Sequence, residues 1–169
     1  LKKYGHPVPE AIVESASREI EALEGMGFNN IKVSLKASSV ISTITAYRLF
    51  SKKYDYPLHI GVSEAGPMFQ GMVKSSVGLG ILLEEGIGDT MRVSLTDNPV
   101  REVETAFEIL RSLGIRKRGV QIVSCPTCGR IEVDLIPLVE ELERKLAGME
   151  KPLKVAVMVL LTDTPVAPL

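Results

Sequence analysis

Short apolar runs alternate with longer segments of helical periodicity along most of this chain. The short runs predict strands at residues 31–35, 57–62, 90–95, 119–123 and 153–158. The longer segments predict helices at residues 12–23, 39–53, 72–85, 99–113 and 134–146. Strands that alternate with helices of about 10–15 residues indicate right-handed βαβ units and a parallel sheet. A doubly wound sheet and a (β/α)8 barrel both fit this order.

Composition indicates a globular protein and narrows the classes of partner. Apolar residues make up 45% of the 169 residues and charged residues 24%, which excludes disorder as the dominant state. No apolar run reaches the roughly 18 residues of a membrane span and no signal peptide is visible, so we expect a cytoplasmic protein without a membrane partner. A net charge of −1 gives no electrostatic basis for nucleic acid as the main partner.

Polar residues follow several of the predicted strands, where the functional groups of both candidate folds gather. The positions selected in this way are Lys36, Ser63, Glu64, Ser94 and the loop from Cys125 to Cys128. Arg92 lies two residues before Ser94 and therefore on the same face of its strand.

Cations beside a hydroxyl suit an anion such as a diphosphate, and the Glu64 carboxylate could transfer a proton. The competing interpretation is that these are ordinary polar residues in solvated ion pairs. For His6 and His59 we expect a packing or surface role, because one lies in a proline-flanked loop and the other inside a strand.

The two cysteines, Cys125 and Cys128, form a Cys-x-x-Cys pair between a predicted strand and a predicted helix. Without an export signal, such a pair indicates metal or redox chemistry more than a structural disulfide. A thioredoxin-like dithiol is one interpretation. Half of a zinc site would need two more ligands, and an iron–sulfur cluster would need more thiolates. Spacing alone leaves these three interpretations open.

Five stretches of the sequence are recognisable together. They are residues 31–38 (IKVSLKAS), 58–66 (LHIGVSEAG), 85–95 (EGIGDTMRVSL), 124–130 (SCPTCGR) and 151–158 (KPLKVAVM). With these stretches the chain resembles the IspG/GcpE family of 4-hydroxy-3-methylbut-2-enyl diphosphate synthases, from its first residues to Met158. The resemblance implies an α/β chain in two parts. Residues 1–116 would be the C-terminal portion of a (β/α)8 TIM barrel, and residues 117–169 the start of an α+β iron–sulfur domain.

The resemblance also implies an activity. The family opens the ring of 2-C-methyl-D-erythritol 2,4-cyclodiphosphate by a two-electron reduction, with a 4Fe-4S cluster and with ferredoxin or flavodoxin as electron donor. By match to the family motifs, Lys36, Arg92 and Ser94 would hold the diphosphate and Glu64 would take part in proton transfer. Cys125 and Cys128 would be two of three thiolate ligands of the cluster. The family also implies a homodimer.

The sequence departs from the family pattern at both ends. Only three barrel strands precede the last barrel helix, whereas the fold has eight. After Met158 the family continues Gly-Cys-Val-Val-Asn-Gly-Pro-Gly-Glu, so the third cysteine is expected where Leu160 stands. Codons for Cys-Val-Val-Asn-Gly read one base later give Val-Leu-Leu-Thr-Asp, the sequence of residues 159–163. We therefore expect residues 159–169 to be an out-of-frame tail.

Two functional hypotheses follow from these departures. In the first, the chain represents an iron–sulfur oxidoreductase of isoprenoid biosynthesis, whose isolated 169-residue chain would be inactive. In the second, the chain is a non-catalytic fragment with residual diphosphate or metal binding. A stand-alone zinc or dithiol protein is a third interpretation, which the absence of other soft ligands near the cysteine pair disfavours.

Overall fold

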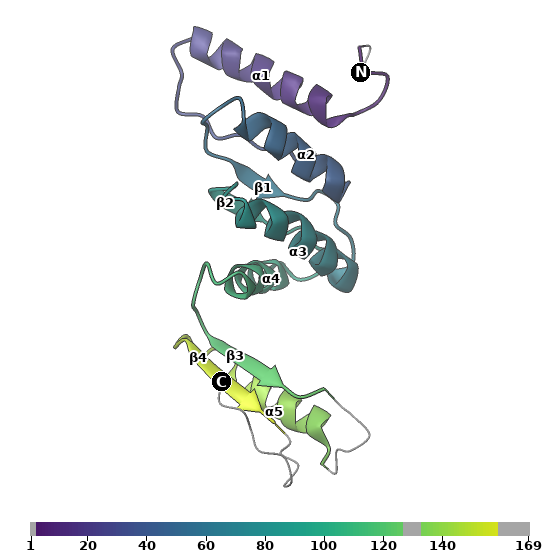
Figure 1. The fold of residues 1–169 in the computed structure, drawn as a ribbon, viewed down its shortest axis with the longest axis vertical. Coiled ribbons are helices and arrows are strands. Elements are labelled where there is room, and N and C mark those ends of the chain that lie inside the picture. Colours follow the sequence, from purple (N-terminus) through teal and green to yellow (C-terminus); the bar gives the residue numbers. More distant parts are fainter. Residues whose placement is uncertain (1–2, 127–132, 159–169) are drawn as a thin grey trace. The chain divides into compact units, whose positions relative to one another are not determined.

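The computed structural model describes residues 3–126 and 133–158 of the chain (Figure 1). The chain divides into two compact units, Leu1–Arg116 and Lys117–Leu169. Within the described residues, no helix is long and apolar enough to cross a lipid bilayer.

The first unit contains four helices and a short parallel sheet (Figure 1). The helices are α1 (Pro9–Gly25), α2 (Val40–Ser51), α3 (Met68–Glu84) and α4 (Pro99–Ser112). The strands β1 (His59–Gly61) and β2 (Thr90–Arg92) pair in parallel, and Val33 forms an isolated parallel bridge to Leu58. The predicted alternation of strands and helices is confirmed. The described part of the chain has the strand order of a barrel segment and does not form a closed barrel.

Two of the helices begin where side chains can satisfy their free amide groups. The Ser39 hydroxyl accepts a hydrogen bond from the Ser42 amide at 3.2 Å at the start of α2. The Asn98 side chain accepts from the Val100 amide at 3.0 Å, with Pro99 at the first position of α4. Both starts are confirmed as predicted. Helix α3 begins at Met68, four residues earlier than predicted and directly after Pro67, so residues 68–71 are helical although they include Gly71.

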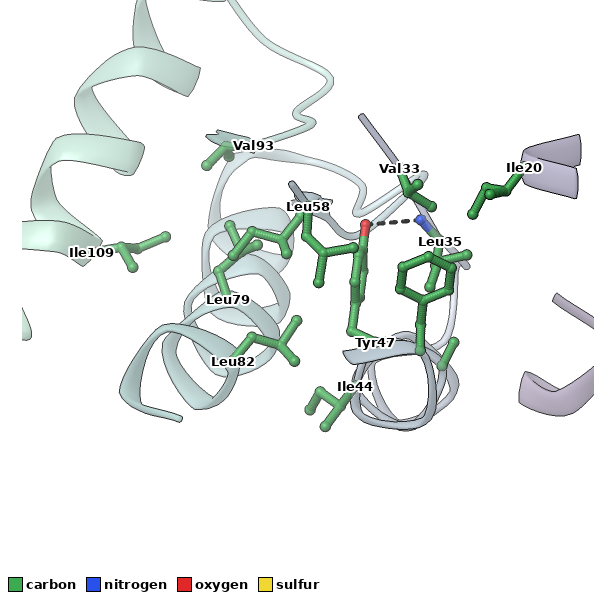
Figure 2. Close-up of a cluster of buried hydrophobic side chains, with 13 residues drawn as sticks. Ile20, Val33, Leu35, Ile44, Tyr47, Leu58, Leu79, Leu82, Val93 and Ile109 are labelled. Carbon is green, nitrogen blue, oxygen red and sulfur yellow. Dashed lines mark hydrogen bonds between the residues drawn. The ribbon is translucent and has the colours of Figure 1, made fainter. Parts of the chain in front are cut away.

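The core of this unit lies between the sheet and helices α2 and α3 (Figure 2). Tyr47 and Phe50 of α2 and Leu79 and Leu82 of α3 are fully buried there. The sheet contributes the buried side chains of Val33, Leu35, Leu58, Ile60, Val62 and Val93. Helix α3 approaches the sheet closely at Gly78, since a Cβ atom at that position would lie 2.9 Å from the Val62 side chain. Gly78 therefore allows close packing between the helix and the sheet.

Tyr47 explains why the strand predicted at residues 31–35 is reduced to a single bridge. The ladder begins regularly, with the His59 amide donating to the Val33 carbonyl at 2.8 Å. At the next step the Leu35 amide donates to the Tyr47 hydroxyl at 3.0 Å (Figure 2). That hydroxyl in turn donates to the His59 carbonyl at 2.6 Å. The phenol therefore replaces a direct bond between the strands. Burial raises the pKa of the Tyr47 hydroxyl.

Helix α4 differs from the sequence expectation in how much of its apolar face is covered. The helical spacing of Val103, Ala106, Phe107, Leu110 and Leu113 predicts one buried apolar face, but Val103 and Leu113 are 56% and 37% exposed. Thr105 and Ile109 are the buried residues of this helix instead. The described residues place no further strand beside β2, so an apolar groove stays open between β2 and α4.

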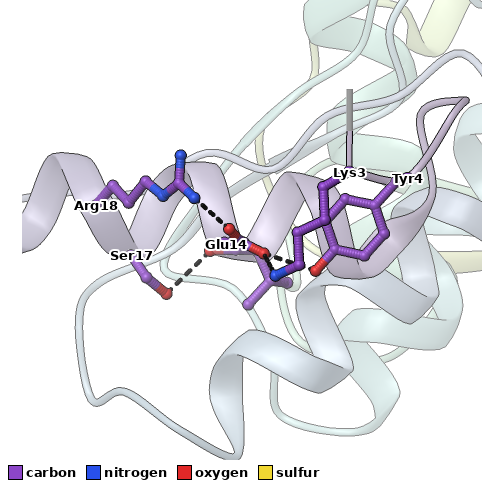
Figure 3. Close-up of polar contacts among 6 residues, drawn as sticks. Lys3, Tyr4, Glu14, Ser17 and Arg18 are labelled. Atoms are coloured by element: carbon purple, nitrogen blue, oxygen red, sulfur yellow. Dashed lines mark hydrogen bonds and ion pairs between the residues drawn. The ribbon is translucent and has the colours of Figure 1, made fainter. Parts of the chain in front are cut away.

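The N-terminal residues are attached to α1 through Glu14 (Figure 3). Its carboxylate accepts hydrogen bonds from the Lys3 ammonium at 2.5 Å and from the Tyr4 hydroxyl at 2.6 Å, and it also pairs with Arg18. These partners, the Lys3 hydrogen bond first, lower the pKa of Glu14 to about 2. The carboxylate therefore stays ionised far below its ordinary range.

The second unit is a βαβ element. Strands β3 (Val120–Ser124) and β4 (Leu153–Val157) pair in parallel with Val120 opposite Leu153, and helix α5 (Leu135–Leu146) connects them. All three elements are confirmed within one or two residues of the predicted bounds. Residues 127–132 and 159–169, and with them Cys128 and the expected out-of-frame tail, lie outside the described residues.

Candidate functional site

The sheet of the first unit has one apolar and one polar face, because side chains alternate along each strand. The apolar side chains described above point toward the helices. We call the opposite side the polar face; its residues are Lys32, Ser34, Lys36, His59, Gly61, Ser63, Thr90, Arg92 and Ser94. These nine residues include three permanent cations and no carboxylate. Such a surface attracts anions and repels cations.

The two cations predicted at strand ends lie on either side of Gly61. Gly61 pairs with Arg92 in the β1–β2 register. The Lys36 stem crosses the space where a Gly61 side chain would stand, because a Cβ atom there would lie 3.1 Å from Lys36 Cε. The same atom would lie only 2.9 Å from the Arg92 carbonyl oxygen. The absence of a side chain at Gly61 therefore leaves room for the Lys36 stem next to the strand that carries Arg92.

The electrostatics of this pair favour an anion. Partial burial, followed by the charges of Arg92 and Lys32, lowers the pKa of Lys36. Like charges held together are unfavourable until an anion compensates them. A doubly charged group such as a diphosphate would relieve this repulsion and accept hydrogen bonds from both side chains.

His59 lies one row before this pair on the polar face and is part-buried, which fits the packing or surface role expected from the sequence. Its Nδ1 atom is 2.8 Å from the Thr90 hydroxyl oxygen on the neighbouring strand. Partial burial, with the charges of Lys36, Lys32 and Arg92 next, lowers the pKa of the imidazole. Residue spacing could have placed His59 on this face, because His59 lies two residues before Gly61 and side chains alternate between the two faces of a strand.

Glu64 and Ser94 lie just past the ends of β1 and β2. The Glu64 carboxylate accepts a hydrogen bond from the Ser38 hydroxyl at 2.8 Å, and the Glu64 backbone has a φ of 51°. This left-handed conformation is uncommon for a residue with a side chain and clusters at functional sites. Ser94 follows Arg92 on the polar face and is half-buried. The structure thus joins Lys36 with Arg92 and ties Glu64 to Ser38.

Two hydrogen bonds fix the loop after β2, one to helix α4 and one to the loop after β1. The Leu95 amide donates to the Glu102 carboxylate of α4 at 2.8 Å. The Thr96 amide donates to the Gly66 carbonyl at 3.0 Å, which joins the loop after β2 to the loop after β1. Ser94 and Glu64 are therefore carried by connected loops.

The cysteine loop begins at the carboxyl end of β3. The Cys125 amide donates to the Val157 carbonyl at 3.0 Å, and the Cys125 sulfur lies 3.3 Å from the Met158 sulfur. The thiol is half-buried and forms no disulfide. Among residues 3–126 and 133–158, no three histidine, cysteine, aspartate or glutamate side chains are grouped to hold a metal ion.

The lowered pKa of His59 predicts a dependence of stability on pH. Below about 6.5, the ordinary imidazole pKa, the unfolded chain binds a proton at His59 that the folded chain binds less readily. The free energy of unfolding should therefore decrease as the pH falls from 6.5. The contribution of His59 to this decrease should be absent in His59→Asn. Urea unfolding across this range measures it, with His6→Asn as control. Equal pH slopes in the wild type and His59→Asn would contradict the expectation.

Comparison with known proteins places both units in one family. The model of the GcpE TIM-barrel domain matches residues 1–107, and that of the GcpE protein C-terminal domain matches residues 121–162. A protein from Thermodesulfovibrio yellowstonii is 60% identical over 158 residues, which cover 94% of this chain and 45% of the relative. A relative from Aquifex aeolicus is 61% identical, with 94% and 44% coverage. A third from Geobacter sulfurreducens is 56% identical, with 98% and 47% coverage.

Each of these three relatives carries the name 4-hydroxy-3-methylbut-2-en-1-yl diphosphate synthase (flavodoxin). The chain spans about half the length of the curated relatives it matches.

Proposed function

This chain belongs to the GcpE family, and we propose that its polar face binds the diphosphate group of the family's substrate. The observation that carries the proposal is that Lys36 and Arg92 both lie next to Gly61, which pairs with Arg92 and leaves room for the Lys36 stem. No carboxylate stands on this face to neutralise them. Cations without a compensating carboxylate favour the binding of an anion.

The proposed roles follow from the chemistry of each side chain. Lys36 and Arg92 bind the diphosphate oxygens by charge-assisted hydrogen bonds. Ser94, on the same face beyond Arg92, donates a hydrogen bond from its hydroxyl. Glu64 transfers a proton at the substrate, and its hydrogen bond from Ser38 orients the carboxylate for this role.

The reaction that we propose for the protein is the reductive ring opening of 2-C-methyl-D-erythritol 2,4-cyclodiphosphate. Its product is the diphosphate in the names of the relatives, 4-hydroxy-3-methylbut-2-en-1-yl diphosphate. Flavodoxin, which those names include, is the proposed electron donor, with ferredoxin as the other candidate. The proposed setting is a cytoplasmic homodimer.

We further propose that residues 1–116 belong to the substrate-binding barrel and residues 117–169 to the cluster domain. A 4Fe-4S cluster supplies electrons in such a domain and is held by several thiolates. Cys125 and Cys128 are the proposed ligands, of which Cys125 lies within the described residues. One thiol does not complete a cluster site, so the described residues do not fit the cluster by themselves. The proposed roles are therefore confined to binding and proton transfer.

Calorimetric titration of the 169-residue chain with the cyclodiphosphate tests the proposal. Removing one charge-assisted bond costs about 1.5–3 kcal/mol, so Arg92→Gln should weaken binding by about 10- to 100-fold. Lys74→Gln is the matched control, because Lys74 is exposed on α3, away from the polar face. Equal affinities for Arg92→Gln and Lys74→Gln would reject the site.

A further inference from the structure

We propose that His59 takes up a proton when a diphosphate binds between Lys36 and Arg92, and that the imidazolium then becomes an additional ligand of the anion. The proposal rests on the diphosphate site of the preceding subsection. The proton comes from the solvent and binds at Nε2 or Nδ1 of the ring. No bond between heavy atoms is made or broken.

The first support is position. His59 is two residues from Gly61 on the same strand, and both face the same side of the sheet. Residues on one face of a strand repeat about every 6–7 Å. Ser34 lies beside His59 on the other neighbouring segment and donates from its hydroxyl to the His59 carbonyl at 3.0 Å. The imidazole therefore occupies the row next to the two cations, within reach of an anion that spans both rows.

The second support is the partner of the ring. The Thr90 hydroxyl, 2.8 Å from Nδ1, can donate to a neutral ring and can accept from a protonated one. His59 can therefore change its protonation state without losing this hydrogen bond. Because Nδ1 is hydrogen-bonded to the Thr90 hydroxyl, Nε2 is the ring nitrogen that is available to bind an anion. Within the described part of the chain, Nε2 has no hydrogen-bond partner.

The third support is the balance of charge around the ring. Lys32 and Lys36 face it from the segment before α2, and Arg92 faces it from β2. On the helix side of the sheet, the Tyr47 hydroxyl bonds to the backbone carbonyl of His59 and not to its ring. The Asp89 carboxylate accepts a hydrogen bond from the Leu58 amide at 2.7 Å. In the free protein, partial burial and then these cations lower the pKa of the ring. A bound anion compensates these charges and adds an acceptor, so both effects raise the pKa of His59.

Nuclear magnetic resonance of the two histidines tests this coupling directly. The chain contains only His6 and His59, so their ring signals can be assigned with His59→Asn. With saturating inorganic pyrophosphate, the pKa of His59 should rise by about one unit or more. The ring signals of His6, which is exposed in the N-terminal loop, should not respond to pyrophosphate. An unchanged His59 pKa at saturation would overturn the proposal.

Calorimetry in two buffers of different ionisation enthalpy provides a second readout. The wild type should take up more protons per bound pyrophosphate than His59→Asn. Subtracting the uptake of the variant from that of the wild type cancels the protons that pyrophosphate itself gains or loses on binding. Thr90→Val should bind pyrophosphate with less proton uptake than the wild type, because valine cannot accept from the protonated ring. Equal uptake in wild type and His59→Asn would refute the coupling.

The two experiments separate this inference from the proposed function. Pyrophosphate binding that Arg92→Gln weakens, without a change at His59, would reject the coupling and leave the diphosphate site standing. Absence of pyrophosphate binding to the wild type would reject both.

Discussion

Gly61→Val is expected to abolish measurable pyrophosphate binding and to lower the melting temperature of the chain. A Cβ atom at this position would stand 2.9 Å from the Arg92 carbonyl oxygen and 3.1 Å from Lys36 Cε. The backbone of β2 cannot move away without breaking the parallel pairing, so Lys36 must leave the site. Overpacking of this kind costs about 1–3 kcal/mol, or roughly 3–10 °C in Tm for a chain of this size. Differential scanning fluorimetry and calorimetry measure the two effects.

The control for this substitution is Gly80→Val in helix α3. A Cβ atom at Gly80 would contact nothing within 4 Å, so the added side chain meets open space. We expect unchanged pyrophosphate affinity and little loss of stability in this variant, because glycine is itself a poor residue within a helix. A Gly61→Val variant that binds pyrophosphate like Gly80→Val would show that the space at Gly61 is irrelevant to the site.

Tyr47→Phe is expected to give the largest loss of stability for the removal of a single atom. The hydroxyl accepts from the Leu35 amide and donates to the His59 carbonyl, and the side chain is fully buried. Phenylalanine would leave both backbone groups without this partner, at a cost of about 1–3 kcal/mol. Urea unfolding measures the change, which should appear as a lower midpoint with an unchanged slope.

Tyr56→Phe provides the matched control, since it removes the same atom from a partly exposed side chain. The Tyr56 hydroxyl contacts only the Glu24 carboxylate at the surface. Exposed contacts of this kind change stability by less than about 0.5 kcal/mol. Equal losses in the two variants would contradict the role of Tyr47 as a link between Leu35 and His59.

Local sequence signals predicted most of the fold. Helix starts depend on a capping side chain, as at Ser39 and Asn98, and the second start also has Pro99 at its first position; both were placed correctly. Strands and helices also differ in the period of their apolar residues, which is a local property. The order of elements in both units was therefore readable from the sequence.

What the sequence did not reveal depends on contacts between distant residues. The strand predicted at residues 31–35 is reduced to one bridge because Tyr47, twelve positions after Leu35, places its hydroxyl between the strands. Helix α3 already includes Gly71, where a Cβ atom would be 2.5 Å from the Leu95 side chain, so this glycine allows close packing within a helix and does not mark a loop. Neither contact has a local signature.

The same difference between local sequence signals and contacts of distant residues applies to the candidate site. Lys36 and Arg92 were identified from their places near strand ends, and the structure brings them to one glycine; their binding role stays a prediction. Gly61 was not selected and His59 was expected to have a packing or surface role, because a glycine or a histidine within a strand has several common explanations. The parallel register, which sets Gly61 against Arg92, gives both residues their place in the site.

The central claim is that the cations of the polar face form an anion site, and one calorimetric comparison tests it. Pyrophosphate is titrated into the wild type, Lys36→Gln/Arg92→Gln and Lys52→Gln/Lys74→Gln. Both double variants lose two positive charges, but Lys52 and Lys74 are exposed and off the polar face. We predict saturable, salt-sensitive binding to the wild type and to the second double variant, and none to the first. Equal binding to the two double variants would contradict the claim.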